Sequence, residues 1–471
     1  MKDITRLINE PNIAELLDDE MLGKIAEDVR VGYQIDDESL EEWRRKNKEA
    51  VALAEQVWEK KQFPFENAAN VKYPLIATSA IQFSARAYPE FVKAPDVVRG
   101  LVIGEDPEGV KAARAERIGQ HMSYQCLNQM EEWEEDTDKL LTHLPVLGTA
   151  LKKTYYSSVL GRNVSEFRKA SSIVINYYAK SLATAPRVTD IFTLYPNEIE
   201  ERKRAGLFLD VDYGSPTSSK DEDQELATQD PDAEHVFYEM HTYFDLDGDG
   251  YKEPYIVVYH KDSQKVARIV ARFSYESISY SGNGRIRLIK PDQYFTKFGF
   301  MPSISGSIYD TGFGSLLAPI NSTINTLINQ LLDSGTLYNL NAGFMGKGIQ
   351  LGRGRGGGEL KFAPNEWKRV LFTGDDLRKH IFPLPVKEPS MVLFNLLGFM
   401  VQAGERLSSV TEILTGDQSN EAERPTTTLA RIEQGLKVFS SIHKRLYRAF
   451  KAEYKRLFEL NYNFMQPKEY F

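Results

Sequence analysis

The stretch from Thr311 to Val410 constrains the fold of this chain more than any other. Apolar residues recur at helical spacing over Phe313–Tyr338 and again over Pro389–Val410, which predicts a helix in each segment. The segment between them, Asn339–Glu388, is rich in glycine and basic residues, and nothing in the whole stretch has the pattern of a catalytic motif. A helix, an excursion and a returning helix predict an antiparallel helix pair with the glycine-rich segment at its tip.

Composition limits the class of protein. With 471 residues, 42% of them hydrophobic, the chain can bury a large core and should contain more than one substructure. A net charge of −9 argues against binding nucleic acid by overall attraction, although it leaves room for a local basic ring. The single cysteine, Cys126, excludes an intrachain disulfide and a cysteine-based metal cluster.

No membrane segment or secretory signal is expected. The N-terminal residues lack the apolar core of a signal peptide. The longest apolar run, Met391–Val401, is far shorter than the roughly 20 residues that a membrane-spanning helix needs. We therefore expect a protein without membrane contact that is made in the cytoplasm.

The rest of the chain predicts an α+β fold that is mainly helical. Residues 1–149 have mostly helical patterns, including one long helix over 111–135, with a short strand at 97–103. From Ala150 onward, β-branched and aromatic runs predict strands at 151–159, 171–177, 187–195, 235–244, 254–260 and 265–273. The last three should form a β-meander within residues 235–275. A long helix over Leu429–Phe464, basic in its middle, is expected near the end of the chain.

The turn between the first two strands of this meander, DLDGDGYKE (residues 245–253), is acidic. Its alternating aspartates match the first half of a calcium-binding loop: Asp245, Asp247 and Asp249. The twelfth position of that loop is Ile256 instead of glutamate, and Glu253 stands three residues earlier. Aspartate and glycine are equally typical of a hairpin turn. A bound Ca²⁺ or Mg²⁺ and a plain turn are both compatible with the sequence, and no other cofactor is predicted.

The glycine-rich segment offers basic side chains to a partner. They are Lys347, Arg353, Arg355 and Lys361. The order of residues is not that of a phosphate-binding P-loop, so we expect either a loop tip or a contact with DNA or a partner protein.

Several long blocks of the sequence resemble the portal proteins of tailed bacteriophages, especially those of short-tailed phages. The blocks cover nearly the whole chain: FPFENAANVKYPLIATSAIQFSARAYP, HMSYQCLNQMEEWEED, GRNVSEFRKASSIVINYYAKSLATAPRVTDIFTLYPNEIEERKRAG, HTYFDLDGDGYKEPYIVVYHKDS and YDTGFGSLLAPINSTINTLINQLLDSGTLYN.

The resemblance implies a subunit of a homo-oligomeric ring, a dodecamer, at one vertex of the virion capsid. Such a head-to-tail connector is the channel through which double-stranded DNA is packaged and ejected. It nucleates procapsid assembly with the major capsid and scaffolding proteins, and it docks the terminase large subunit and later the adaptor and tail proteins. It is a structural protein and not an enzyme, because a separate terminase consumes the ATP.

The resemblance also implies a division of the chain into parts. These are a mixed α/β wing (1–310), a first stem helix (311–338), a small α/β clip (339–388), a second stem helix (389–413), a tunnel loop (414–428), and a long wing helix with the start of a crown (429–471). Because the sequence stops soon after the long helix, we expect a short or truncated crown.

The stem helices should be apolar enough to pack together and against neighbouring subunits. The apolar stripe of the first consists of Leu316, Leu317, Ile320, Ile324, Leu327, Ile328, Leu331 and Leu332, and that of the second of Leu393, Leu396, Leu397, Met400, Val401, Leu407 and Val410. A ring requires head-to-tail contacts, which accounts for broad apolar coverage on both helices. The polar face of the first helix, which is expected to line water, carries Asn321, Thr323, Asn325 and Asn329.

DNA contacts in such a channel should be weak and independent of sequence, because tight phosphate binding would stall the moving duplex. The tunnel loop fits this requirement with polar and acidic residues: Asp417, Gln418, Ser419, Asn420 and Glu421. Two alternatives remain. One is a different phage head–tail connector ring without the stem hairpin, and the other is a metal-dependent hydrolase that uses the acidic turn.

Overall fold

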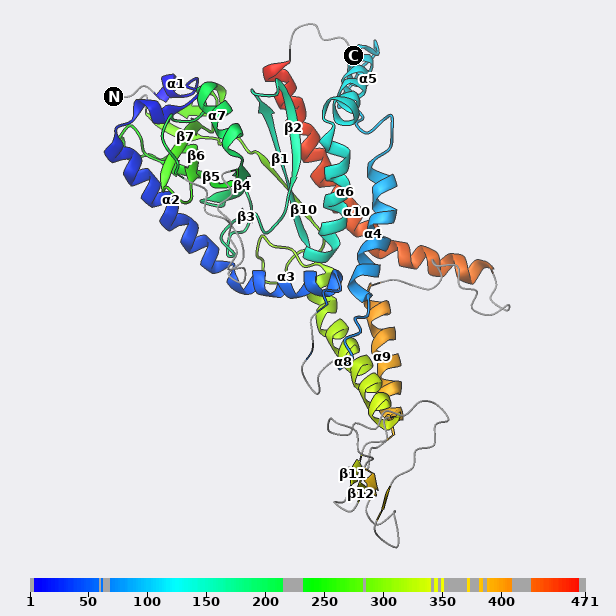
Figure 1. Ribbon diagram of the computed structural model, residues 1–471. Coiled ribbons are helices and arrows are strands. Elements are labelled where there is room, and N and C mark those ends of the chain that lie inside the picture. The colour runs from blue at the N-terminus through cyan, green and yellow to red at the C-terminus, as the bar shows by residue number, and fades with distance from the viewer. Residues whose placement is uncertain are drawn as a thin grey trace. The chain divides into compact units, whose positions relative to one another are not determined.

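The structure, a computed structural model, confirms a mixed α+β fold in which about half of the chain is helical and all sheets are antiparallel (Figure 1). It describes residues 4–58, 61, 68–214, 232–282, 285–339, 343–345, 349–350, 371–372, 381–383, 388–408 and 425–465. The chain divides into two compact units. We call residues 1–55, 75–318 and 408–471 the body, and residues 56–74 and 319–407 the helix-pair unit.

The helices of the body lie mostly in its first half and at its end. They are α1 (Ile4–Leu7), α2 (Asp19–Ser39), α3 (Glu41–Ala54), α4 (Leu75–Phe91), α5 (Val110–Tyr124), α6 (Glu132–Leu147), α7 (Pro196–Arg204) and α10 (Pro425–Phe464). Short 3-10 helices cover Ile13–Leu16 and Tyr275–Ser277. Among the described residues, no helix combines the length and apolarity that crossing a membrane requires.

In the described part of the body, the strands form three sheets. They are β1 (Thr149–Ser157), β2 (Arg162–Arg168), β3 (Ile173–Val174), β4 (Val188–Leu194), β5 (His235–Phe244), β6 (Glu253–His260), β7 (Lys265–Ala271), β8 (Ile278–Tyr280), β9 (Ile286–Ile289) and β10 (Phe295–Gly299). Their orders are β10-β1-β2, β3-β4-β5-β6-β7 and β8-β9. The predicted meander is confirmed, since β5, β6 and β7 are antiparallel neighbours in chain order.

The five-stranded sheet is covered on both faces. On one face, Tyr238 and Val257 belong to a buried cluster with Val29 of α2. On the other face, Phe237 packs in a cluster that includes Ile199 of α7. Every residue of β6 is buried, as expected for a central strand with both faces packed.

The three-stranded sheet holds α10 through a buried ionic network. Lys152 of β1 and Glu453 of α10 have fully buried side chains, with Nζ 3.2 Å from Oε1. The same Oε1 accepts hydrogen bonds from Trp133 Nε1 at 2.9 Å and Ser165 Oγ at 2.7 Å, and Lys152 donates to Thr137 Oγ1 at 2.8 Å. This network therefore joins α6, β1, β2 and α10 at one point, and removal of either charge would leave the other buried and unpaired.

Three predictions about secondary structure need correction. The helix expected over 111–135 is divided, because α5 continues as a π-helical turn at Gln125–Gln129 before α6 begins. There Gln125 exchanges two side-chain hydrogen bonds with Asn461 of α10, a tertiary contact that helical periodicity does not encode. The strand expected at 97–103 is absent, and the backbone of Val98 bonds to the Ser123 side chain instead. The strand expected at 171–177 is reduced to β3.

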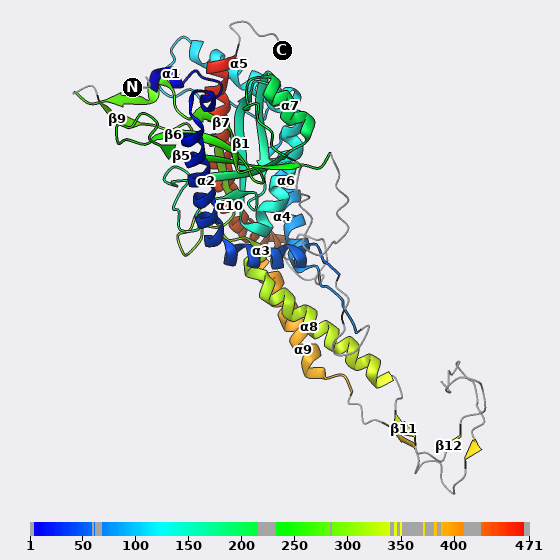
Figure 2. The ribbon, with the colours of Figure 1, turned by 60° about the vertical axis from the view of Figure 1, so that its left-hand side comes forward.

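The helix-pair unit contains most of α8 (Phe313–Asn339) and of α9 (Met391–Ser408), which confirms both helices predicted for this region. Both views show the two helices side by side (Figure 2). Between them in sequence, β11 (Gly343–Met345) pairs with β14 (Ile381–Pro383), and β12 (Ile349–Gln350) pairs with β13 (Leu371–Phe372). The two short ladders are nested in sequence, as in a chain that leaves one helix and returns to the next.

Candidate functional site

The acidic turn joins the ends of β5 and β6. The pair of residues next to the turn is Phe244, the last residue of β5, and Glu253, the first residue of β6. Gly248 and Gly250 adopt φ values of 78° and 90°, a region that favours glycine, so the alternation of aspartate and glycine fits the path of the turn.

The structure brings the three predicted aspartates together and adds a fourth carboxylate. Asp245, Asp247, Asp249 and Glu253 each have a ligand oxygen within 4.8 Å of those of the other three. The turn's own amides bind the aspartates: Gly248 and Gly250 donate to Asp245 at 2.7 and 2.9 Å. These hydrogen bonds hold the carboxylates in place, and each carboxylate has further lone pairs for a ligand.

Glu253 differs from the aspartates because its side chain is completely buried. Its Oε2 accepts long hydrogen bonds of 3.4 Å from the Leu246 amide and the Tyr255 hydroxyl, and its Oε1 has no hydrogen-bond partner among the described residues. Burial, together with the charges of Asp247 and Asp245, raises the pKa of Glu253 to about 7. Glu253 stands at the ninth position of a calcium loop that begins at Asp245, a position that often ligates the ion through a water. Spacing alone did not single it out as a direct ligand, because spacing does not show that its side chain is buried beside the three aspartates.

This arrangement can hold a hard divalent cation, because it presents only carboxylate oxygens. All four clustered groups are carboxylates, with no serine, cysteine or histidine among them. The metal-dependent hydrolysis considered above would use the same bound ion to activate a water, so the cluster supports ion binding without assigning a reaction.

A second candidate feature is an extended segment, residues 69–73, which lies along α8 inside the helix-pair unit. The backbone amides of Ala69, Val71 and Tyr73 donate at 2.7 Å to carbonyl or carboxylate oxygens at every fourth position of α8, namely Asp333, Asn329 and Asn325. Four helical residues rise about 6.0 Å and two extended residues about 6.6 Å, so alternate amides match successive turns.

These contacts correct the expectation of a water-lined polar face on α8. Asn321, Asn325 and Asn329 are buried. Asn329 also donates from Nδ2 to the Val71 carbonyl at 3.1 Å, so its amide satisfies both backbone groups of one residue. The sequence does indicate a buried polar contact, because asparagines at i, i+4 and i+8 interrupt an apolar helix. This pattern does not identify the segment that the asparagines bind.

Replacing Asn329 with alanine is expected to release this segment. The variant loses two hydrogen bonds to a partly buried backbone site, which costs about 1–3 kcal/mol. Hydrogen exchange measured by mass spectrometry should show faster exchange of the Val71 amide. Thr326→Ala is the matched control, because Thr326 is exposed and bonds only within α8. Equal exchange in the two variants would contradict the assigned role of Asn329.

The surface of α9 is apolar and exposed. Large apolar side chains exposed along it are Met391, Val392, Phe394, Leu396, Phe399 and Leu407. Phe394 and Phe399 are 61% and 66% exposed, and no residue between Met391 and Ala403 is buried. Several large apolar side chains exposed along one helix are typical of an interaction surface.

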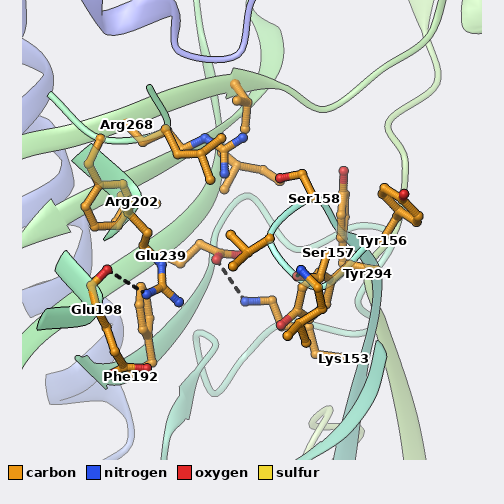
Figure 3. A pocket seen from close by; sticks show the side chains of 18 of the residues that line it. Lys153, Tyr156, Ser157, Ser158, Phe192, Glu198, Arg202, Glu239, Arg268 and Tyr294 are labelled. Carbon is orange, nitrogen blue, oxygen red and sulfur yellow. Dashed lines mark hydrogen bonds and ion pairs between the residues drawn. The ribbon is translucent and has the colours of Figure 1, made fainter. Parts of the chain in front are cut away.

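The body also contains a cavity of about 470 Å³ that is lined in part by the half-buried end of β1 (Figure 3). At its wall, Lys153 Nζ lies 2.8 Å from Glu239 and 3.0 Å from Asp190. Burial opposes the charge on Lys153, but these two carboxylates outweigh it and raise the lysine pKa. The paired charges explain how a lysine is tolerated inside the body.

The remaining predicted site residues lie outside the described part of the chain. These are Asp417, Gln418, Ser419, Asn420 and Glu421 of the expected tunnel loop and Lys347, Arg353, Arg355 and Lys361 of the expected clip.

Comparison with known proteins adds no family assignment. No protein-family model matches the chain, and no curated protein matches its sequence.

Proposed function

We propose that this chain is a portal subunit: one of the identical copies that form a ring at a capsid vertex and let double-stranded DNA through. The observation that carries the proposal is the exposed apolar surface of α9, which lies beside α8. In the sequence, the glycine-rich segment separates these two helices. Neither helix has a described partner that covers Phe394 or Phe399, and neighbouring copies of the same helix pair would do so.

A ring supplies this cover by symmetry. Head-to-tail contacts place one face of each copy against a different face of the next, and they close when the rotation divides a full turn. Burial of a phenylalanine or leucine side chain contributes about 1.5–3 kcal/mol, so several such residues on each copy give a substantial interface. Because every copy offers the same surface, a homo-oligomer would bury α9 without any other partner.

The body supports the proposal in a second way. The helix α10 is fixed to the three-stranded sheet by the Lys152–Glu453 network and by the edge-to-face contact of Phe450 with Phe298, whose ring centroids are 5.0 Å apart. A conduit that transmits force between a packaging motor and a capsid needs such rigid connections. In this proposal the terminase, the adaptor and tail proteins, and the capsid and scaffolding proteins bind to the assembled ring in the virion.

The proposed mechanism involves no chemical step by this chain. DNA would pass residues of low affinity, since phosphate contacts strong enough to fix the duplex would oppose translocation. The test is the oligomeric state of the purified full-length chain, measured by mass photometry and negative-stain imaging. A ring supports the proposal, and a stable monomer with metal-dependent hydrolytic activity would refute it.

A further inference from the structure

The hairpin between β5 and β6 contains a group that the proposed function does not use. Glu253 begins β6, and its side chain is fully buried. The Oε1 atom of this carboxylate has no hydrogen-bond partner among the described residues. A buried carboxylate oxygen without a partner is costly, and natural structures generally compensate it with an ion, a water or a hydrogen-bond donor.

The carboxylate of Glu253 lies beside those of the three aspartates. The ligand oxygens of Asp245, Asp247, Asp249 and Glu253 lie within 4.8 Å of one another. Asp245 and Asp247 are partly buried, and only Asp249 is exposed. No lysine or arginine ion pair reaches any of the four among the described residues. Four carboxylates thus converge on one point without a cation from the protein.

We propose that these four residues bind one calcium ion, which the Glu253 carboxylate ligates from the buried side. A site with only oxygen ligands disfavours soft metal ions, which prefer sulfur ligands. Ca²⁺ accepts six to eight oxygens in flexible geometry, whereas Mg²⁺ demands a near-ideal octahedron and usually keeps several waters. A cluster in which all four protein ligands are carboxylates, drawn from nine consecutive residues, fits Ca²⁺ better.

The ion would join the turn to the core of the body. Leu246, inside the turn, and Tyr255, two residues beyond Glu253, both belong to the buried cluster that α2 covers. Tyr251 lies in the turn as well, and its hydroxyl accepts a hydrogen bond from the Ile289 amide of β9 at 3.1 Å. Binding at the four carboxylates would therefore fix the β5–β6 hairpin against β9 and the core.

The experiment uses the full-length chain after treatment with EDTA. Titration with TbCl₃ should give tyrosine-sensitised luminescence from a single saturable site, because Tyr251 and Tyr255 are close in sequence to the ligands. CaCl₂ should displace the terbium and raise the melting temperature, and MgCl₂ at equal concentration should do neither. Equal displacement by magnesium would overturn the assignment to calcium.

Two variants locate the site. Glu253→Gln keeps the shape of the side chain and its acceptor for the Leu246 amide, and we expect at least tenfold weaker calcium binding with no loss of melting temperature in the absence of metal. Asp247→Asn, which changes a partly exposed group, should weaken binding similarly. Glu276→Gln is the matched control, because Glu276 is an exposed carboxylate outside the cluster. Absence of saturable binding in the wild type, or equal binding by wild type and Glu253→Gln, would refute the site.

Discussion

Replacement of Glu453 with alanine is expected to destabilise the body by about 3–5 kcal/mol, the cost of breaking a buried ion pair from one side. The change leaves the Lys152 ammonium fully buried with the Thr137 hydroxyl as its remaining hydrogen-bond acceptor among the described residues. It also removes the acceptor of Trp133 Nε1 and Ser165 Oγ. Because these groups lie on α6, β1 and β2, the loss should loosen the attachment of α10 to the whole sheet.

The free energy of unfolding from urea titration measures this effect. The matched control is Glu459→Ala on the same helix, which removes an exposed pair with Lys455 at 3.6 Å and should cost less than about 1 kcal/mol. The double variant Lys152→Met/Glu453→Leu should recover part of the loss, because no charge then remains buried. If Glu453→Ala is no less stable than Glu459→Ala, the network does not anchor α10.

Substitution of Val392, Phe394 and Phe399 by serine is expected to abolish assembly while the single chain stays folded. These side chains are 74%, 61% and 66% exposed, so their loss removes little from the chain's own core. In an assembly, each buried apolar side chain contributes about 1.5–3 kcal/mol, and a ring loses that contribution at every interface. Sedimentation velocity should show a shift from a large species to the monomer, with unchanged circular dichroism.

A control for this prediction replaces three exposed apolar side chains of the body instead. Leu101, Ile103 and Ile304 are 86%, 89% and 103% exposed, and their substitution by serine should leave assembly intact. Dissociation by both triple variants would mean that general loss of hydrophobicity, and not the α9 surface, explains the effect. Assembly that survives the α9 substitutions would exclude α9 from the interface.

Local periodicity was sufficient to predict most of the regular structure. The helices α8, α9 and α10 and the β5–β6–β7 meander were predictable because their apolar spacing is repeated over many residues. The π-helical break at Gln125 was not, because its cause is an exchange of side-chain hydrogen bonds with Asn461, 336 residues away. The spacing of neighbouring residues does not reveal a contact with a residue so far away in the sequence.

The same limit applies to the candidate sites. The spacing of the three aspartates was sufficient to predict an acidic turn. The role of Glu253 depends on its burial against the core, which spacing alone does not reveal. Likewise, asparagines on α8 indicated a polar face, and only the fold shows that it binds the backbone of residues 69–73. The anchoring role of Glu453 in the basic helix α10 could not be predicted from the sequence, because its partner Lys152 lies 301 residues earlier.

The central claim is that many copies of this chain close into a ring around a channel. Two-dimensional class averages of the purified full-length chain, from negative-stain electron microscopy, test it most directly. The account predicts end-on views of a closed ring of about twelve copies with a central opening, built by head-to-tail contacts. Images that show only monomers, at concentrations where mass photometry finds no larger species, would contradict it.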